Sequence, residues 1–170
     1  VDQTQRLQTM VDQLLELSKL EQLQAPQAPQ SVVLADFCKR FVPPAQAARR
    51  QIAIETVANV PFATVQADPG LLGLALSNLL ENAAAFSPAG STVRVEVQGT
   101  VVSVTDSGPG APDFALPHLG EKFFSTVRPD GASKGSGLGL AIVRQIMALH
   151  GGRMVVRNTE SGLRVELQFG

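Results

Sequence analysis

Three short groups of residues have the types and spacings that suit the binding of a phosphorylated ligand. The first is Asn78 and Asn82, four residues apart in an apolar stretch. On a helix this spacing puts both carboxamides on one face, where their oxygens can bind Mg²⁺ and their N–H groups can meet phosphate oxygens. An isolated pair of asparagines is more often a solvated part of a helix surface, so the pair alone predicts little.

The second group is Asp106-Ser-Gly-Pro-Gly110, which follows a run of β-branched residues. The Asp106 carboxylate can accept a hydrogen bond from the exocyclic amine of adenine, while Gly108 and Gly110 let the ring approach closely. Guanine has an oxygen in that position and would be repelled. The same residue types also favour an ordinary turn. A dinucleotide-binding fingerprint is excluded, because Pro112 and a loop follow the glycines instead of a helix.

The third group is the glycine-rich stretch Gly135-Ser-Gly-Leu-Gly139, which leads into a helical pattern. Free N–H groups and the positive end of the helix dipole attract an anion such as a triphosphate. Lys134 and Lys122 can add positive charge, although each also suits a solvated surface. Phe123 and Phe124 are expected to pack on the core beside the site. The predicted nucleotide site as a whole is Asn78, Asn82, Asp106, Gly108, Gly110, Lys122, Phe124, Lys134, Gly135, Ser136, Gly137, Leu138, Gly139 and Leu140.

The elements that carry these groups follow from the spacing of apolar residues. Apolar residues at every third or fourth position predict helices over 1–24, 35–50, 69–86 and 136–150, the second disturbed by Pro43 and Pro44. Asp68 is the expected N-cap of the third helix, with Pro69 as its first residue. Alternating or β-branched runs predict strands over 31–34, 52–57, 64–66, 93–97, 101–105, 153–157 and 163–169.

Breaks in these patterns divide the chain. Pro26 and Pro29 interrupt the first helical pattern, which predicts a helix over 1–24, a linker over 25–30 and a compact domain over 31–170. Residues 111–133 contain three prolines and no sustained periodicity. A loop of this length inside a compact domain is expected to be a mobile lid.

The composition fits one compact domain with an appendage. The chain has 170 residues and a net charge of −1, with acidic and basic residues mixed, which argues against nucleic acid as a partner. Cys38 is the single cysteine, expected as a small buried apolar residue. No apolar stretch is long enough to span a membrane, and residues 1–9 have no signal-peptide pattern.

Taken in order, four motifs resemble the N, G1, F and G2 boxes of histidine-kinase catalytic domains. They are Asn78-Leu-Leu-Glu-Asn82, Asp106-Ser-Gly-Pro-Gly110, Phe123-Phe124 and Gly135-Ser-Gly-Leu-Gly139-Leu140. These domains belong to the ATP-binding superfamily shared with gyrase, Hsp90 and MutL. The resemblance covers nearly the whole chain. It implies a Bergerat-type α/β sandwich, in which helices cover one face of a mixed, mostly antiparallel sheet, here with an added N-terminal helix.

The resemblance also implies a function. ATP and Mg²⁺ would be the cofactors, with Asn82 as the metal ligand, and the γ-phosphoryl would pass to a histidine and then to a response-regulator aspartate. The chain would be a cytoplasmic domain of a homodimeric parent anchored in the bacterial inner membrane. The stretch 111–140 is similar to CreC-type kinases in particular. Ala85 departs from the pattern, because many kinases have a basic residue there, so triphosphate affinity is expected to be modest.

The segment Arg6–Glu21 resembles the second helix of the dimerisation and phosphoacceptor hairpin, and the first hairpin helix is missing. In the family that first helix carries the phosphorylated histidine, with an acidic residue directly after it. Neither His118 nor His150 is followed by an acidic residue. The chain is therefore expected not to phosphorylate itself. The helix is also expected to fray or to pair with another copy, because nothing covers its apolar stripe of Leu7, Leu14 and Leu17.

Two other functions are compatible with the sequence. In gyrase- and chaperone-type ATPases a glutamate at the place of Asn78 activates water, and asparagine cannot act as that base. Glu81 is the only carboxylate nearby, so slow hydrolysis stays open with Glu81 as the candidate base. The second alternative is a nucleotide-binding regulatory module without kinase activity. The four complete boxes argue against it.

Overall fold

A computed structural model describes residues 3–125 and 137–169. The helices are α1 (Gln3–Gln22), α2 (Leu34–Arg40), α3 (Ala45–Arg49), α4 (Pro69–Phe86) and α5 (Gly139–Leu149), with a 3₁₀ turn η1 (Leu116–His118). The strands are β1 (Gln30–Val33), β2 (Ala53–Ala58), β3 (Thr64–Ala67), β4 (Thr92–Gln98), β5 (Val101–Thr105), β6 (Arg153–Asn158) and β7 (Leu163–Gln168). Each predicted strand is therefore present, with bounds that differ by one residue at most.

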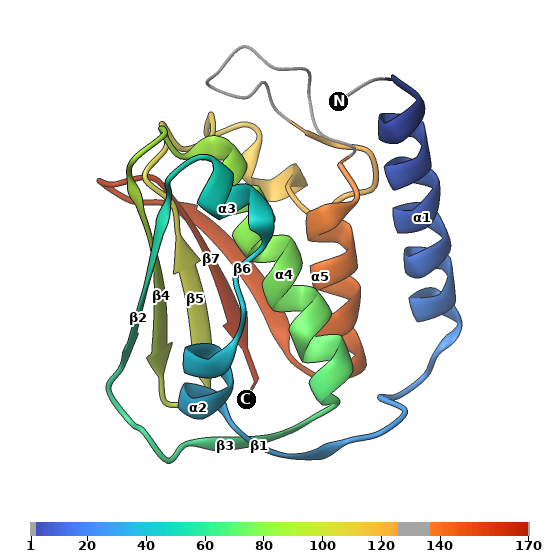
Figure 1. The fold of residues 1–170 in the computed structure, drawn as a ribbon. Helices are drawn as coiled ribbons and strands as arrows, with labels where there is room; N and C mark the ends of the chain where they lie inside the picture. The colour runs from blue at the N-terminus through green and yellow to red at the C-terminus, as the bar shows by residue number, and fades with distance from the viewer. Residues whose placement is uncertain (1–2, 126–136, 170) are drawn as a thin grey trace.

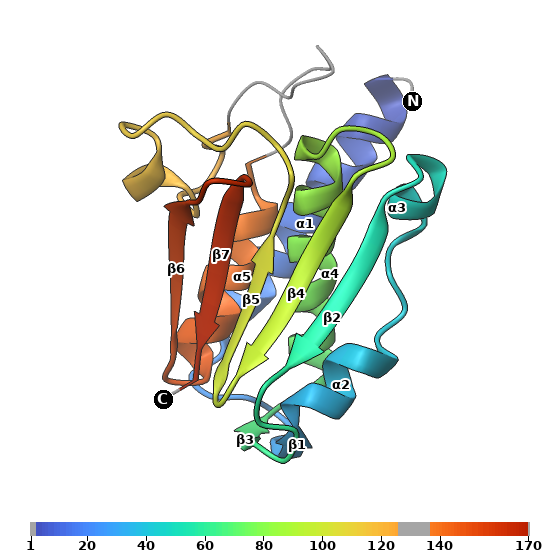
Figure 2. The same ribbon diagram turned by 90° about the vertical axis from the view of Figure 1, so that its left-hand side faces the viewer.

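Five strands form the main sheet in the order β2-β4-β5-β7-β6. β2 runs parallel to β4, and the other three neighbouring pairs are antiparallel. Helices α4 and α5 cover one face, and the other face is open (Figures 1 and 2). β1 and β3 form a separate antiparallel ribbon below the sheet. The predicted sandwich, with helices on one face of a mixed, mostly antiparallel sheet, is confirmed.

The hydrophobic core lies between the sheet and the two long helices that cover it. Alternate residues of β4, Val93, Val95 and Val97, are buried, as expected of a strand with one face on a core. The helical side of the core is made of large aliphatic residues of α4 and α5, namely Leu72, Leu76, Leu79, Leu80, Ile142, Ile146 and Met147. Cys38 of α2 is also buried, and burial raises the pKa of its thiol to about 11, so its predicted role as a small apolar residue is confirmed.

Helix α4 begins where the sequence predicts. The Asp68 side chain accepts hydrogen bonds from the backbone N–H groups of Gly70 (2.9 Å) and Leu71 (3.3 Å), and Pro69 is the first helical residue. The helix ends at Phe86. Its start is also tied to the end of α5, because the N–H of Asp68 donates to Nε2 of His150 at 3.0 Å. These contacts fix α4, the carrier of the two asparagines.

The prediction of one helix over 35–50 is wrong. The structure has two short helices, α2 and α3, separated by an extended segment that includes Pro43 and Pro44. Phe41, at the end of α2, has φ −66° and ψ 131°, which is an extended conformation. Proline cannot donate the helical hydrogen bond and disfavours helical geometry in the residue before it, so the pair ends the helix instead of bending it.

Helix α1 lies beside α5, on the far side of that helix from the sheet (Figure 1). Leu17 and Leu20, near its end, are buried, whereas Leu7 is 63% exposed and Leu14 43%. The expectation that Leu17 has no partner is therefore wrong, because the last turns of α1 pack on the domain. Leu7 near the start of the helix and Leu14 in its middle are exposed, as expected. No helix within the described ranges is long and apolar enough to cross a bilayer.

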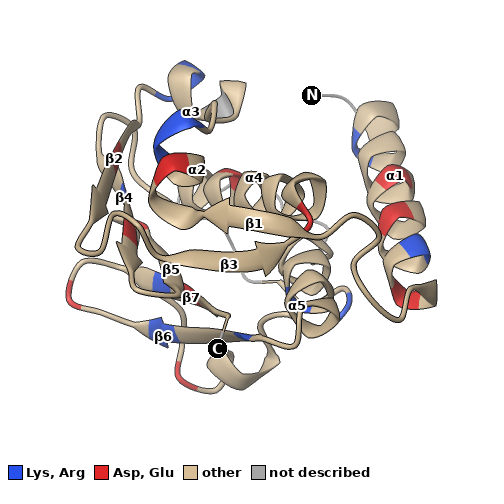
Figure 3. Ribbon diagram, turned by 90° about the horizontal axis from the view of Figure 1, so that it is seen from below, with Lys and Arg blue, Asp and Glu red and all other residues tan. Residues whose placement is uncertain are grey.

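The open face of the sheet carries ion pairs instead of an apolar layer. Arg164 lies between two carboxylates, 3.0 Å from Glu166 and 3.7 Å from Glu96. Burial alone would raise the pKa of Glu166, but hydrogen bonds and charge from Arg157 and Arg164 outweigh it and hold that pKa below its usual value. Seen from below, acidic and basic segments lie mixed over the molecule (Figure 3).

Candidate nucleotide-binding site

Asp106 directly follows β5 and is only 3% exposed. Its Oδ1 accepts hydrogen bonds from the backbone N–H groups of Gly108 (3.0 Å) and Leu163 (2.9 Å). Within the described ranges no hydrogen bond to Oδ2 is recorded. Burial raises the pKa of the carboxyl above its usual value, and the two N–H groups oppose that shift. The residue thus has one oxygen fixed by the protein and one left to accept from a ligand.

The turn after Asp106 is packed against the end of α4. The N–H of Ser107 donates to Oγ of Ser87 at 3.0 Å. A Cβ on Gly108 would collide with the carbonyl oxygen of Phe86, so only glycine fits there. The geometry therefore requires Gly108 for close packing of the protein itself, in addition to any approach by a ligand ring.

The β6–β7 turn closes the other side of Asp106. A Cβ on Gly162 would collide with the backbone oxygen and with Oδ1 of Asp106. Asn158, at the start of this turn, hydrogen-bonds to the backbone of Ala111. Asn158 and Gly162 were not among the predicted site residues. No local pattern could have found them, because their contacts join segments about fifty residues apart in the sequence.

Asn78 of α4 lies next to the start of α5. It is 8% exposed, and its Nδ2 donates to the carbonyl oxygen of Leu74 at 2.9 Å. Its Oδ1 would lie 3.2 Å from a Cβ placed on Gly139, so the amide oxygen faces the first residue of α5. Asn82 is half-buried one turn further along α4, and Glu81 beside it is exposed. Both asparagine oxygens are of the ligand type that Mg²⁺ prefers.

Helix α5 starts at Gly139, three residues later than predicted. Gly137 before it has φ +74°, a conformation that side chains disfavour, and its carbonyl accepts from the N–H of Phe123 at 3.0 Å. Leu138, at the N-cap, is buried and makes no side-chain capping bond. Lys134, Gly135 and Ser136 of the predicted site lie outside the described residues.

The segment predicted as a mobile lid is partly ordered. Residues 111–125 contain η1 and several backbone hydrogen bonds, and Ala115 is fully buried. The lack of sequence periodicity in this part therefore does not mean a lack of structure, because Leu116 and Leu119 pack against the core. Its mobility as a lid stays a prediction. Residues 126–133 of the predicted lid lie outside the described residues.

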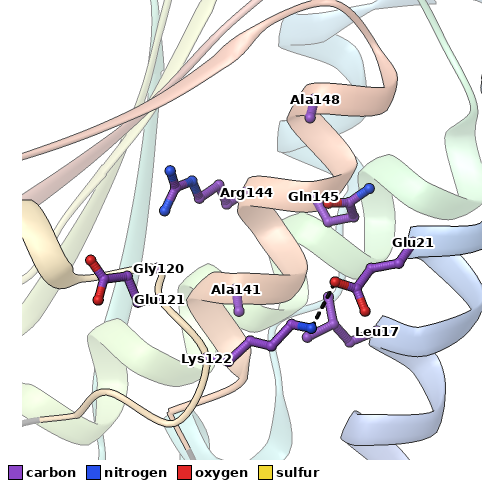
Figure 4. Close-up of a pocket in the computed structure, with 9 residues that line it drawn as sticks. All are labelled: Leu17, Glu21, Gly120, Glu121, Lys122, Ala141, Arg144, Gln145 and Ala148. Carbon is purple, nitrogen blue, oxygen red and sulfur yellow. Dashed lines mark ion pairs between the residues drawn. The ribbon is translucent and has the colours of Figure 1, made fainter. Parts of the chain in front are cut away.

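Lys122 lies beside α1. Its Nζ is 2.8 Å from a carboxylate oxygen of Glu21 (Figure 4). The two side chains line a hollow of about 450 Å³ between α1, α5 and the segment 120–122. Leu17 and Arg144 also line this hollow. Lys122 is predicted to contact phosphate. In this structure its ammonium group forms an ion pair with the Glu21 carboxylate of the N-terminal helix.

The two phenylalanines differ in environment. Phe123 is 57% exposed and has φ +66°, so the expectation that it packs on the core is wrong. Phe124 is half-buried, and its ring centre lies 5.5 Å from that of His118. The left-handed backbone of Phe123 packs closely against Gly137, and the ring of Phe123 faces outward.

Comparison with known proteins decides the family. The model of the "Histidine kinase-, DNA gyrase B-, and HSP90-like ATPase" family matches residues 67–170. The chain belongs to this ATPase family. The match begins at the end of β3 and includes α4, the Asp106 turn and α5, which carry the site described above.

Within this family the similar proteins are sensor kinases. Sensor protein QseC of Salmonella typhi is 40% identical over 162 residues, which cover 92% of this chain and 35% of QseC. Sensor protein CreC of Escherichia coli K12 is 35% identical over 169 residues, or 94% of this chain and 34% of CreC. The solved cytoplasmic segment of histidine kinase QseC has a TM-score of 0.67 and 28% identity, covering all of this chain and 96% of that segment.

The chain thus has the ATP-binding catalytic domain of sensor histidine kinases, and the predicted family is confirmed. It spans about a third of the length of the curated relatives that it matches. CreC is among those relatives, as the narrower resemblance suggested, but the identity to QseC is higher.

Both histidines of this ATPase-family chain are engaged in local contacts. Nδ1 of His150 lies 2.7 Å from the carbonyl oxygen of Ile146, while Nε2 faces the N–H of Asp68. A carbonyl requires a donor and an N–H requires an acceptor, so the ring is the neutral tautomer with hydrogen on Nδ1. Nδ1 of His118 lies 2.9 Å from a carboxylate oxygen of Glu121.

Proposed function

We propose that the chain binds ATP with the adenine amine on Asp106. The observation that carries this proposal is the unequal use of the two carboxylate oxygens. Oδ1 is held by two backbone N–H groups, and Oδ2 is the oxygen left for a donor. An adenine amine supplies such a donor, whereas guanine presents an oxygen at the same position. Gly108 and Gly110 complete the edge of the adenine site.

The phosphates would lie toward the start of α5. Gly139 has no side chain there, and the first N–H groups of the helix point outward along its axis. Asn78 faces this place with its amide oxygen, and Asn82 would bind Mg²⁺ between the protein and the phosphates. The residues present fit the metal, because amide and phosphate oxygens are its usual ligands. Bound magnesium would neutralise charge on the triphosphate. Leu138, Leu140 and Phe124 would line the site, with Lys134, Gly135 and Ser136 beside the phosphates.

The proposed reaction is transfer of the γ-phosphoryl to a histidine outside this chain. Helix α1 would be the second helix of the dimerisation and phosphoacceptor hairpin, followed by a linker over 25–30 and the catalytic domain over 31–170. The exposed end of α1, around Leu7 and Leu14, suits a helical partner. The parent protein would be a homodimer, anchored in the inner membrane with this domain in the cytoplasm, and a response regulator would receive the phosphoryl group.

Hydrolysis of ATP is the alternative within the same family. Asn78 cannot act as a base, and its amide nitrogen already donates to the carbonyl oxygen of Leu74 within α4. Glu81 is the carboxylate next to the site, and desolvation raises its pKa above the usual value. A raised pKa makes a carboxylate a stronger base. Glu81→Gln would therefore abolish any slow hydrolysis by this chain.

Labelling with ATP tests the proposed reaction. Incubation of the chain with γ-labelled ATP should give no acid-labile, base-stable phosphoprotein, because His118 and His150 are both held in local contacts. A longer protein that includes the upstream helix and its histidine should become labelled. Labelling of His118 or His150, or a longer protein that binds ATP and stays unlabelled, would contradict the proposal.

A further inference from the structure

The β6–β7 turn contacts both ends of the Asp106–Gly110 segment. At its far end Leu163 donates its N–H to Asp106, and Gly162 packs against the same residue. At its near end Asn158 is bonded to Ala111, directly after the segment. The proposed adenine contacts include only residues of the segment itself, so the role of Asn158 is open.

The side chain of Asn158 makes two hydrogen bonds to one backbone residue. The N–H of Ala111 donates to Oδ1 at 2.9 Å, and Nδ2 donates to the carbonyl oxygen of Ala111 at 2.7 Å. A carboxamide has the same donor and acceptor pair as a peptide group. The side chain thus pairs with the backbone of Ala111 in the way that a residue of a neighbouring strand would. It joins two positions that are 47 residues apart in the sequence.

Gly110 is shaped by the same contact. It has φ +77°, and a Cβ placed on it would lie 2.5 Å from Oδ1 of Asn158. Both the backbone conformation and the close approach of the amide therefore require glycine. Asn158 thus packs against the end of the turn at Gly110. Ser87 and Phe86 contact the start of the turn at Ser107 and Gly108.

We propose that Asn158 is a positioning residue for the nucleotide base. By fixing Gly110 and Ala111, it keeps the turn in the shape in which Oδ2 of Asp106 can meet the adenine amine. This inference rests on the proposed function. Asn158 acts at the adenine end, so it sets the affinity for ATP and ADP equally and leaves the dependence on Mg²⁺ unchanged.

Two variants and a matched control test the proposal. Asn158→Ala removes both hydrogen bonds, and Asn158→Asp keeps an acceptor for the N–H of Ala111 but puts a second oxygen against its carbonyl. Without these bonds the turn is no longer fixed in shape, so both variants should bind ATP and ADP about tenfold more weakly. Asn59, directly after the opposite edge strand β2, is the control, and Asn59→Asp should bind within about twofold of the unmodified chain.

The measurement is calorimetric titration at a temperature where circular dichroism shows every variant folded. Affinities of both Asn158 variants within twofold of the unmodified chain would overturn the proposal. So would a loss confined to ATP in the presence of Mg²⁺, because that would put the effect at the phosphates. If the unmodified chain bound no ATP, the proposed function itself would fail. Amide exchange at Ala111 without nucleotide then tests the contact alone, and it should be faster in Asn158→Ala.

Discussion

The ammonium group of Lys122 lies 2.8 Å from the carboxylate of Glu21, so the N-terminal helix holds a residue that the sequence assigns to the nucleotide phosphates. Both side chains are about half-exposed. An exposed ion pair is weak, and it can exchange with another anion. Glu21 and a triphosphate would therefore compete for Lys122, which links the position of α1 to nucleotide binding.

Removing the competing carboxylate should strengthen nucleotide binding. Glu21→Gln is expected to raise the affinity for Mg-ATP by up to about fivefold, the upper range for an exposed ion pair. Glu16→Gln removes the same charge from the same helix and is the control. In a Lys122→Gln background the Glu21 substitution should have no effect. Titrations in which Glu21→Gln and Glu16→Gln behave alike would show that the pair does not compete with the ligand.

Asp106 should lower the stability of the nucleotide-free chain. Burial raises its pKa above the usual 3.8, against the opposing effect of the N–H groups of Leu163 and Gly108. A raised pKa means that the folded chain binds this proton more tightly than the unfolded chain. The charged carboxylate therefore lowers the free energy of unfolding at neutral pH, and this loss is relieved as the pH falls through the folded pKa.

The Asp106→Asn variant separates stability from binding. It should be more stable than the unmodified chain at pH 7, and its advantage should shrink as the pH approaches about 4. Its affinity for ATP should fall by about 2 kcal/mol, because an amide donor replaces a charged acceptor. Asp113→Asn makes the same charge change at an exposed position. Urea unfolding that showed a pH-independent difference would contradict the assignment of the raised pKa.

Two helical glycines should respond differently to alanine. In α4, a Cβ on Gly73 would meet Phe41 at an ordinary 3.7 Å, so Gly73→Ala should stabilise the chain by about 0.5–1 kcal/mol. At the start of α5, a Cβ on Gly139 would lie 3.2 Å from Oδ1 of Asn78. Gly139→Ala should leave the fold intact and weaken ATP binding. Equal ATP affinities for the two variants would argue against phosphates at Gly139.

Asn82→Ala should abolish the effect of magnesium on nucleotide binding. Alanine is a good helix former, so α4 and the fold should remain. ATP affinity would be compared with Mg²⁺ and with EDTA for both chains. A variant that still binds Mg-ATP more tightly than free ATP would require another residue as the metal ligand.

Local signals in the sequence predict most of the fold. Asp68 and Pro69 locate the start of α4 because an N-cap and a first-turn proline act through neighbouring backbone groups. The strands are found to within one residue because one of their faces is buried. Pro43 and Pro44 mark a break in the sequence, but the apolar spacing on both sides does not show that they end the helix.

Contacts between distant segments are what the sequence does not predict. The burial of Leu17 depends on α5, which follows more than a hundred residues later. Lys122 is near the expected site in sequence, yet its partner is Glu21 of the first helix. Asn158 is an ordinary polar residue at the end of a strand until the fold brings it to Ala111. The motifs predict a nucleotide site, and long-range contacts of this kind set the positions of its residues.

Selection of adenine by Asp106 can be measured by parallel titration of the chain with Mg-ATP and Mg-GTP. The unmodified chain should bind Mg-ATP and should bind Mg-GTP more weakly by at least tenfold, the factor that corresponds to about 1.4 kcal/mol. Asp106→Asn should remove most of that preference. Equal affinities for the two nucleotides in the unmodified chain, or no binding of Mg-ATP, would show that Asp106 does not select adenine.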